Sequence, residues 1–482
     1  MALDARNFEQ VWPSFIGGRW LTHGEATLTV DNPATGKPLA RVACAGPEEV
    51  DLAVRAARAA FRASQAAAAH PKERAAMMMR VADRLRARRD EGARVLCLES
   101  GKALRDALGE FDEAARYFEY YAGVVDKLEG KTVPLGGNYV NFTEYEPYGV
   151  SAQIIPWNFP VSLAARSLAP ALAAGNAVVM KSPELTPLAM VLIAEACADA
   201  GVPAGLVNLV CGLGREAGAA LAGHPDIDQI VFTGSVGTGK QILHAAAERT
   251  LPCVVELGGK SAGIVFGDAD LSRVLDSVRN GIFLNAGQVC SALSRLVVHE
   301  SVYDRTVAAV AELIHGLRIG DGIDDADLTP VISGSQCQRI AAMCDAAVAE
   351  GARLVRGGKM IDRPGYFFAP TLFADVRPDM AIAREEVFGP VLVAMRFRDE
   401  DEAIALANDT DFGLVAGVFT KDIGTALRSA RRLEAGQVFV NEWFAGGIET
   451  PFGGRKRSGF GREKGLEALA NYLQIKNFGI AL

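Results

Sequence analysis

The sequence predicts an α/β fold with a parallel, doubly wound sheet and a second α/β domain, and three observations support this. Short apolar strands alternate with helical segments from Gly149 onward. A second alternation begins after Gly259, and the connecting segments are long enough for crossover helices. The 482 residues are 50% hydrophobic and 22% charged, which excludes a disordered, collagenous or coiled-coil chain. At roughly 150 residues per domain the chain has room for about three structural units.

The first third of the chain is predicted to be helical. Val50, Val54, Ala57 and Phe61 recur at helical spacing within residues 48–65. Similar patterns predict helices over residues 72–99 and 103–127, and the aromatic residues of the third segment are expected to pack in a core. Pro and Gly interrupt the chain between residues 132 and 137, so residues 138–146 are predicted to be extended.

Nine apolar runs are predicted to form the strands of the two domains. The first five lie at residues 151–155, 177–180, 206–210, 229–232 and 253–257, and the other four at 263–266, 295–299, 391–397 and 437–441. Parallel sheets bind ligands beyond the carboxyl ends of their strands. Asn158, Lys181, Gly234 and Glu256 lie at or just past such ends, so we expect a ligand site there.

Charge and cysteine usage exclude several classes of protein. The net charge of −8 gives nucleic acid no general reason to bind, and no stretch approaches the roughly 20 apolar residues of a membrane span. The first residues show no basic segment followed by an apolar core, so we expect a cytoplasmic protein. The eight cysteines are dispersed without CxxC pairs, which argues against a disulfide framework or a structural zinc site, and no metal is expected.

A glycine-rich turn, TGSVGTGKQ, follows the predicted strand 229–232. Glycines let the backbone approach a phosphate closely, and the helix that follows offers free amides. Gly234 to Lys240 fits GxxxxGK, but Gln241 stands where a P-loop needs Ser or Thr to hold magnesium. The spacing GxxGxG also departs from GxGxxG. A tight turn without a ligand remains an alternative, although the place in a βα series favours a dinucleotide over a nucleotide triphosphate.

Three further residues are candidates for chemistry, and each has a plainer alternative. Cys290 follows a Gly-Gln turn and could be a nucleophile, or one more buried and inert cysteine. Glu256 closes an apolar strand, which would raise its pKa toward that of a general base unless it pairs with Lys260. Asn158 lies in a loop stiffened by two prolines and could donate to an oxyanion, or simply occupy a turn.

Taken together, these motifs carry a family resemblance. PWNFP, MKSPE, FTGS with GTGK, ELGGK, GQVC, EEVFGP and PFGGRKRSG occur in that order, and the chain from about Phe15 to Phe478 resembles the aldehyde dehydrogenase superfamily. The resemblance implies a Rossmann-like cofactor domain over residues 1–129 and 148–256 and a catalytic α/β domain over 257–446. It also implies a small β oligomerisation element over 130–147 and 447–482.

The resemblance also assigns catalytic roles. Cys290 would be the nucleophile, Glu256 the general base, and Asn158 would form an oxyanion hole with the Cys290 backbone amide. The implied reaction oxidises an aldehyde to a carboxylic acid through a cysteine thiohemiacetal and a thioester. A CoA-acylating relative, a non-catalytic paralogue and a nucleotide triphosphatase are the alternatives. Glu256 argues against the CoA-acylating relative, and the presence of all three catalytic residues argues against the non-catalytic paralogue. Gln241 argues against the nucleotide triphosphatase.

NAD is the expected cofactor, with NADP possible, because the Glu184 carboxylate would repel an additional phosphate. The resemblance places a set of residues around it: Ile154, Pro156, Trp157, Lys181, Ser182, Glu184, Gly214, Phe232, Thr233, Gly234, Ser235, Leu257, Glu386 and Phe388.

The substrate is expected to be either an ω-semialdehyde, such as succinic semialdehyde, or an aromatic aldehyde. By resemblance the substrate would meet Phe159, Arg166, Val289, Ser291 and Trp443. Arg166 stands where semialdehyde dehydrogenases carry an arginine for the distal carboxylate, but Leu284 replaces their second arginine. Arg166 could instead cap a helix or pair with an acid on the surface.

No nucleic acid or membrane partner is expected. The alternating, extended segments at residues 130–147 and 470–478 lack obvious cover from their own domain. By resemblance they form an arm that extends the sheet of a neighbouring subunit, which gives a homodimer or a homotetramer.

Overall fold

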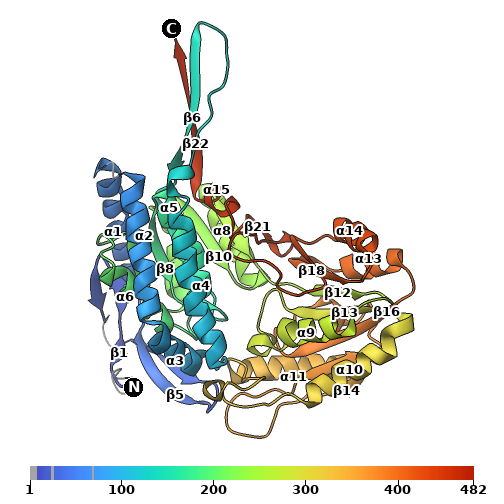
Figure 1. Ribbon diagram of the computed structural model, residues 1–482. Helices are drawn as coiled ribbons and strands as arrows, with labels where there is room; N and C mark the ends of the chain where they lie inside the picture. Colours follow the sequence, from blue (N-terminus) through green and yellow to red (C-terminus); the bar gives the residue numbers. More distant parts are fainter. Residues whose placement is uncertain (1–7, 23–25, 68–69) are drawn as a thin grey trace.

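The computed structural model describes residues 8–22, 26–67 and 70–482, so the expectation about the very first residues lies outside the described part. Two α/β units lie side by side, and a two-stranded ribbon projects from the first of them (Figure 1). Among the described helices, none is long and apolar enough to cross a membrane. The chain therefore has the α/β fold that the sequence predicts, with two main sheets.

The first third is not purely helical as predicted, because five short strands precede its helices. They are β1 (Val11–Trp12), β2 (Ser14–Ile16), β3 (Arg19–Leu21), β4 (Thr27–Asn32) and β5 (Lys37–Ala43). Strands of two to seven residues interrupted by Pro13 and the Gly17-Gly18 turn leave too short an alternation to recognise. β2 pairs antiparallel with a strand more than 190 residues later, Phe15 lying opposite Leu209.

Helices α1 (Pro47–Ala67), α2 (Pro71–Ala87), α3 (Arg89–Ser100) and α4 (Leu104–Ala122) follow, with a short 3-10 turn η1 (Val125–Lys127). The single helix predicted over residues 72–99 is therefore two helices that meet at Arg88, which has non-helical φ and ψ of −98° and 2°. The Arg88 guanidinium forms ion pairs with Glu195 and Asp199, which lie on a later helix. The aromatic side chains Phe111, Tyr117, Phe118 and Tyr121 of α4 are fully buried, as predicted.

The first sheet has eight strands in the order β21-β11-β10-β7-β8-β9-β2-β3. Its parallel centre is β7 (Val150–Ile154), β8 (Ala177–Lys181), β9 (Val207–Val210), β10 (Gln229–Thr233) and β11 (Cys253–Glu256), which agrees with the five predicted runs. The connections contain α5 (Pro160–Ala174), α6 (Leu188–Asp199), the turn η2 (Gly214–Gly218), α7 (Ala219–Ala222) and α8 (Val236–Arg249).

The second sheet has seven strands in the order β14-β15-β16-β13-β12-β18-β19. The four predicted runs correspond to β12 (Ser261–Val265), β13 (Leu293–His299), β16 (Val391–Phe397) and β19 (Gln437–Val440). The prediction missed β14 (Arg353–Arg356), β15 (Thr371–Ala374) and β18 (Val415–Phe419). The helical segments of this unit are α9 (Leu271–Ile282), η3 (Leu284–Gly287), η4 (Glu300–Val302), α10 (Tyr303–His315), η5 (Gly322–Asp324), α11 (Gly334–Ala349), α12 (Ala381–Arg384), α13 (Glu400–Asn408) and α14 (Ile423–Arg432).

Residues 447–472 pack on both units, whereas the sequence prediction groups them with the oligomerisation element. β20 (Arg455–Lys456) pairs with β17 (Phe412–Gly413) of the second unit, and β21 (Gly459–Phe460) pairs with β11 at the edge of the first sheet. The short helix α15 (Glu467–Ala470) has Ala468 and Leu469 buried in the first core. The Gly-rich segment 453–461 thus joins the two units instead of extending away from them.

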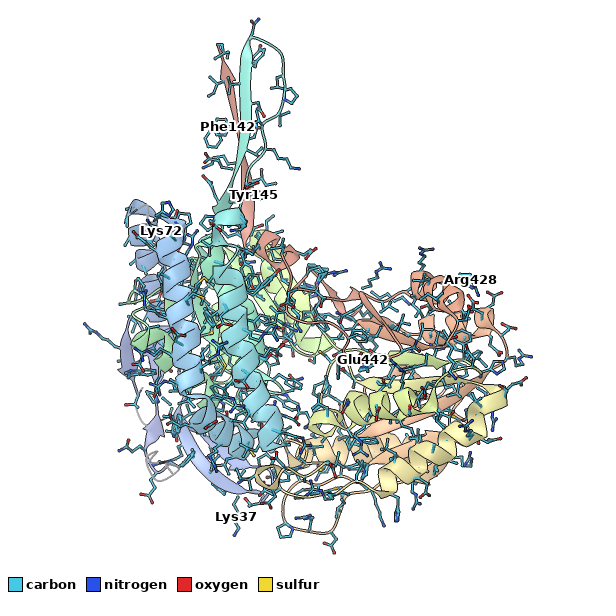
Figure 2. The ribbon with its side chains drawn as sticks, in the orientation of Figure 1. Lys37, Lys72, Phe142, Tyr145, Arg428 and Glu442 are labelled. Carbon is cyan, nitrogen blue, oxygen red and sulfur yellow. The ribbon has the colours of Figure 1, made fainter. Side chains whose placement is uncertain are left out.

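The ribbon consists of β6 (Tyr139–Pro147) and β22 (Leu473–Ala481), which pair antiparallel from Leu473 opposite Pro147 to Ala481 opposite Tyr139. It stands clear of the body, and Tyr145 lies nearer its base than Phe142 does (Figure 2). The rings of Phe142 and Phe478 stack 4.7 Å apart across the two strands. Tyr472 at the base is buried, whereas Ile475 is 64% exposed.

Candidate active site

Four strand ends of the first sheet bring predicted site residues to one edge. The register pairs Ile154 with Lys181 and with Phe232, and it pairs Thr233 with Glu256. Because these strands are parallel, their carboxyl ends all face the same side of the sheet. The sheet edge therefore collects the residues that the motifs single out.

The glycine-rich turn leads directly into α8. Ser235 is the N-cap of this helix, and its Oγ accepts a hydrogen bond from the Thr238 amide at 3.2 Å. A Cβ on Gly234 would lie 2.6 Å from the ring of Phe232, so a side chain does not fit at this position. Leu257 packs against Gly239 in the first turn of the helix, where a Cβ would lie 2.5 Å from its Cδ2. The backbone at the positive end of the helix is thus left accessible to an anionic group.

A cation and a carboxylate lie together past the end of β8. Lys181 is buried, and burial lowers the pKa of its amine, while the Glu184 carboxylate lies 4.0 Å away. Glu184 accepts a hydrogen bond from the Gly214 amide, and the buried Ser182 hydroxyl has no hydrogen-bond partner among the described residues. This donor and acceptor set suits a ribose and its phosphates, which supports the expectation that a dinucleotide fits this edge.

The second unit contributes Glu386 and Phe388, which follow α12. Glu386 Oε1 accepts a hydrogen bond from the Gly259 amide at 3.0 Å, and burial raises the pKa of its carboxyl to about 7. Phe388, which has a positive φ of 55°, places its ring 5.4 Å from that of Trp157, edge to face. The loops on either side of Pro156 and Phe388 therefore meet across the boundary between the two units.

Cys290 follows a loop with unusual backbone geometry. Asn285 and Ala286 both have positive φ, at 49° and 52°. A Cβ on Gly287 would collide with the Gly389 carbonyl. Gln288 fixes the loop, because its Oε1 accepts from the Ile332 amide at 2.8 Å and its Nε2 donates to the Asn285 carbonyl at 3.0 Å. Such backbone strain is kept only where the surroundings hold it, and here it sets the position of the thiol.

Asn158 lies against this loop from the first unit. Its Nδ2 donates to the Gln288 carbonyl at 3.0 Å, which leaves its second amide hydrogen available. The Asn285 Nδ2 donates in return to the Asn158 carbonyl at 3.1 Å. The Cys290 backbone amide makes no hydrogen bond with any described residue. Two free donors beside the thiol are what an oxyanion hole requires.

The sequence reasoning missed a buried ion pair under Asn158. Lys102 and Glu110 pair with both side chains almost fully buried, and Lys102 Nζ also donates to the Asn158 carbonyl at 2.9 Å. Glu110 accepts a hydrogen bond from the Ser162 amide at the start of α5, at 3.1 Å, and the Lys102 amine lies 4.0 Å from the ring centre of Phe159. The pair thereby holds both ends of the loop that carries Asn158. A buried Lys eight residues before a Glu gives no distinctive pattern in the sequence.

A cavity of about 350 Å³ leads to the partly exposed Cys290. It lies between α4, α5, the Cys290 loop and the segment from Phe444 to Phe452. Four of the five predicted substrate residues line it, namely Phe159, Arg166, Val289 and Ser291. Trp443 does not line it: its indole N–H donates to the Ser291 carbonyl at 3.0 Å, so the ring lies behind the nucleophile loop.

Arg166 is buried and forms an ion pair with the buried Glu463, so it neither caps a helix nor pairs on the surface. Glu463 is a second residue that sequence reasoning missed. It follows the PFGGRKRSG motif, and only the folding of residues 447–472 back onto the first unit brings it to Arg166.

Glu256 has the environment predicted for a general base. Its side chain is 1% exposed, and no side chain of the described residues donates a hydrogen bond to its carboxylate, although the Gly454 backbone amide acts on it as a donor and lowers its pKa slightly. Burial, followed by the charge of Glu463, raises its pKa to about 8. The Lys260 amine likewise has no hydrogen-bond partner in the described part of the chain, which argues against the alternative of a Glu256–Lys260 salt bridge.

Burial also raises the pKa of the Cys290 thiol, to about 12, and the Glu256 charge adds to this effect while Arg166 opposes it. The protonated thiol is therefore the favoured form of Cys290 at neutral pH. Glu256 does not line the cavity, but its electrostatic effect on Cys290 means that the two groups lie close together. The site thus combines a partly accessible thiol with a carboxyl group that is ready to accept a proton near neutral pH.

Comparison with known proteins identifies the family. The aldehyde dehydrogenase family model matches residues 20–478. An aldehyde dehydrogenase of Aspergillus niger is 42% identical over 97% of this chain and 95% of its own. Hydroxyisobutyraldehyde dehydrogenase of Mycolicibacterium austroafricanum is 41% identical over 97% of this chain and 93% of its own. The NAD+ complex of an aldehyde dehydrogenase from Bacillus cereus superposes with a TM-score of 0.96 and 39% identity, and the match covers 98% of this chain and 97% of that one. The chain therefore belongs to the aldehyde dehydrogenase family and is an oxidoreductase.

Proposed function

We propose that the protein oxidises an aldehyde to the carboxylic acid with NAD+, through a thiohemiacetal and then a thioester on Cys290. The observation that carries this proposal is the combination of Cys290, which is partly exposed at the end of a largely apolar cavity, with the buried Glu256 carboxylate, whose charge acts on its thiol. Such a carboxylate suits the hydrolysis of a thioester, because its raised pKa makes it an effective proton acceptor for the attacking water.

In the first half of the reaction the Cys290 thiol releases its proton to water in the cavity, and its sulfur forms a bond to the aldehyde carbon as the C=O π bond opens. The oxygen of the adduct becomes negative, and the free hydrogen of Asn158 Nδ2 and the Cys290 amide are the donors that would stabilise it. When bound, NAD+ supplies the acceptor for the hydride that leaves this adduct. Lys102 and Gln288 take no part in bond making. Lys102 holds the Asn158 backbone in position, and Gln288 holds the loop that carries Cys290.

In the second half Glu256 takes a proton from the water that attacks the thioester. A carboxyl group with a pKa of about 8 is a better proton acceptor than an ordinary glutamate when ionised, and a part of it is ionised at neutral pH. Hydrolysis breaks the bond between sulfur and carbon, releases the carboxylic acid and returns the Cys290 thiol.

The edge of the first sheet fits NAD+ by its donor set. In this assignment the N-terminus of α8 would hold the pyrophosphate, and Lys181 with Glu184 would hold the adenosine ribose. Glu386 would hold the nicotinamide ribose, on the side where Trp157 and Phe388 meet. The Glu184 carboxylate repels a phosphate on the ribose, so NAD+ should be preferred to NADP+.

The test is to incubate the protein with NAD+ and an aldehyde, to follow reduced cofactor by absorbance, and to quantify the acid. Formation of one acid per reduced cofactor supports the proposal, with Cys290→Ser as the control. If no aldehyde in a panel of aliphatic and aromatic compounds reduces NAD+ or NADP+, the proposal is wrong. Release of an acyl-CoA in the presence of CoA would assign the acylating reaction instead. A higher kcat/KM with NADP+ would overturn the cofactor preference.

We also propose a homodimer or homotetramer in the cytoplasm. The ribbon exposes apolar side chains on two strands with open edges, among them Tyr139, Val140 and Ile480. Pairing with another copy would protect these edges. All eight cysteines are free, as expected for a reducing compartment. Light scattering of the purified protein tests the assembly, and a monomeric mass would refute it.

A further inference from the structure

The charges that line the cavity are all neutralised within the protein. Arg116, Arg166 and Lys464 are the cations among the lining residues, and Glu113 is the one lining carboxylate. Lys464 Nζ lies 3.6 Å from Glu113 Oε1, and Arg116 Nη2 lies 3.3 Å from Glu449 Oε1. With Arg166 paired to Glu463, each cation has a carboxylate of its own.

The Arg166–Glu463 pair is the one nearest the chemistry. Its electrostatic influence reaches both Glu256 and Cys290, whereas Arg116 and Glu449 are more than half exposed at the rim. Both partners of the inner pair are at least 95% buried, and the Arg166 guanidinium lies 5.0 Å from the ring centre of Phe452. A buried cation in this state is not free to bind a carboxylate of a substrate.

A substrate carboxylate could reach Arg166 only by competing with Glu463. It would either sit beside Glu463 as a like charge in a desolvated site, or displace it and leave a buried carboxylate without a partner. Both arrangements are unfavourable, because an uncompensated buried charge costs more free energy than one new ion pair returns. The remaining walls offer mainly apolar and aromatic contacts, among them Tyr117, Phe159, Leu163, Phe439, Phe444 and Phe452.

We propose that this site selects uncharged aldehydes with an apolar or aromatic remainder, and that Glu463 excludes ω-semialdehydes by occupying Arg166. This inference rests on the proposed function. Of the two substrate classes that the sequence left open, it favours the aromatic one.

The first test uses the unmodified enzyme and two matched pairs of aldehydes. Pentanal is compared with succinic semialdehyde, and benzaldehyde with 4-carboxybenzaldehyde, by kcat/KM with NAD+. The neutral member of each pair should be favoured by about tenfold or more. Equal or better use of either carboxylate compound overturns the inference. Activity with neutral aldehydes would still support the proposed function in that case, whereas no activity with any of the four fails the proposed function itself.

The second test frees the arginine. Glu463→Gln keeps the shape of the side chain and removes its charge, so it should raise the ratio of kcat/KM for succinic semialdehyde over pentanal by about tenfold. The matched control is Glu449→Gln, which frees the exposed Arg116 and should change this ratio by less than about threefold. An unchanged ratio in a folded Glu463→Gln variant refutes the role of Glu463.

Loss of folding in Glu463→Gln is checked by the thermal midpoint. If Glu463→Gln does not fold, the double variant Arg166→Leu with Glu463→Leu is used instead. It removes both buried charges, a change that proteins often tolerate. It should keep the preference for pentanal, because no cation is exposed. A gain in relative activity toward succinic semialdehyde in the double variant would contradict the inference.

Discussion

The substitution Glu256→Gln should stabilise the folded protein and impair catalysis, because burial disfavours the charged form of the native carboxylate. Glu256 is 1% exposed, and burial, reinforced by the charge of Glu463, raises its pKa from 4.5 to about 8 despite the Gly454 backbone amide. The charged carboxylate therefore destabilises the folded state by an amount on the order of a few kcal/mol at neutral pH, and by more as the pH rises. The amide has the same shape and carries no charge, so it avoids this cost.

The sign of the pH dependence follows from the direction of the shift. Below pH 4.5 the Glu256 carboxyl is protonated in both the folded and the unfolded chain, and it costs nothing. As the pH rises toward 8 the unfolded chain releases its proton while the folded chain retains it, and stability falls. The thermal midpoint of Glu256→Gln should therefore match that of the wild type near pH 5 and exceed it increasingly up to pH 9.

Catalysis should change in the opposite direction. Glu256→Gln should release about one equivalent of reduced cofactor per active site and then stall at the thioester, because an amide cannot take a proton from water. Thermal scans from pH 5 to 9 test the expected stability, and a stopped-flow burst measurement tests the expected catalysis. Parallel stability curves for variant and wild type would refute the reasoning about burial. A folded variant without a burst would show that Glu256 also takes the proton of the Cys290 thiol.

Three more perturbations have definite expected outcomes. Cys290→Ala should lower turnover more than about a hundredfold while NAD+ binding, measured by calorimetry, is kept, and higher residual activity would reassign the nucleophile. Lys102→Met leaves a buried Glu110 carboxylate unpaired, so it should lower the free energy of unfolding in denaturant by about 3–5 kcal/mol. The double variant Lys102→Met with Glu110→Leu should restore most of this stability. Equal stability of the single variant and the wild type would contradict this expectation. Ending the chain after Leu473 removes only the second strand of the ribbon and keeps the buried Tyr472, so the oligomeric mass in light scattering should fall, and an unchanged mass would place the interface elsewhere.

The parallel strands were predictable because burial on both faces leaves uninterrupted apolar runs, as in Ala177–Lys181 and Val391–Phe397. Among the strands that the prediction missed, β15 and β18 are short but fully buried, whereas others depend on partners far away in the chain. β2 needs β9, and β14 at the sheet edge shows three exposed residues in four. No local pattern marks such strands, since their pairing energy is not encoded within the segment itself.

The residues of the candidate site also fall into two groups, those that the sequence motifs mark and those that they do not. Cys290, Glu256 and Asn158 lie in ordered motifs, and the family resemblance of these motifs assigns the roles that we propose for them. In the structure Asn158 contacts the loop before Cys290, and the charge of Glu256 acts on the Cys290 thiol. Lys102 and Glu463 look like ordinary surface charges in the sequence. Each is buried only because the fold supplies a counter-charge, and for Glu463 that partner lies 297 positions earlier. Packing of residues 447–472 against the first unit decides the state of Arg166, which the sequence alone left open.

The place of β21 has a consequence for the order in which the protein can become active during synthesis. Gly459 pairs with Glu256, and the Leu257 amide donates to the Ser458 carbonyl, so the wall beside Glu256 is made by residues translated about 200 positions later. At roughly 5–20 residues per second, the emerging first unit waits ten seconds or more for this strand. Throughout that interval the strand carrying Glu256 has an open edge. A nascent chain therefore exposes no finished site, and the surroundings of Glu256 are complete only after the second unit has also been made.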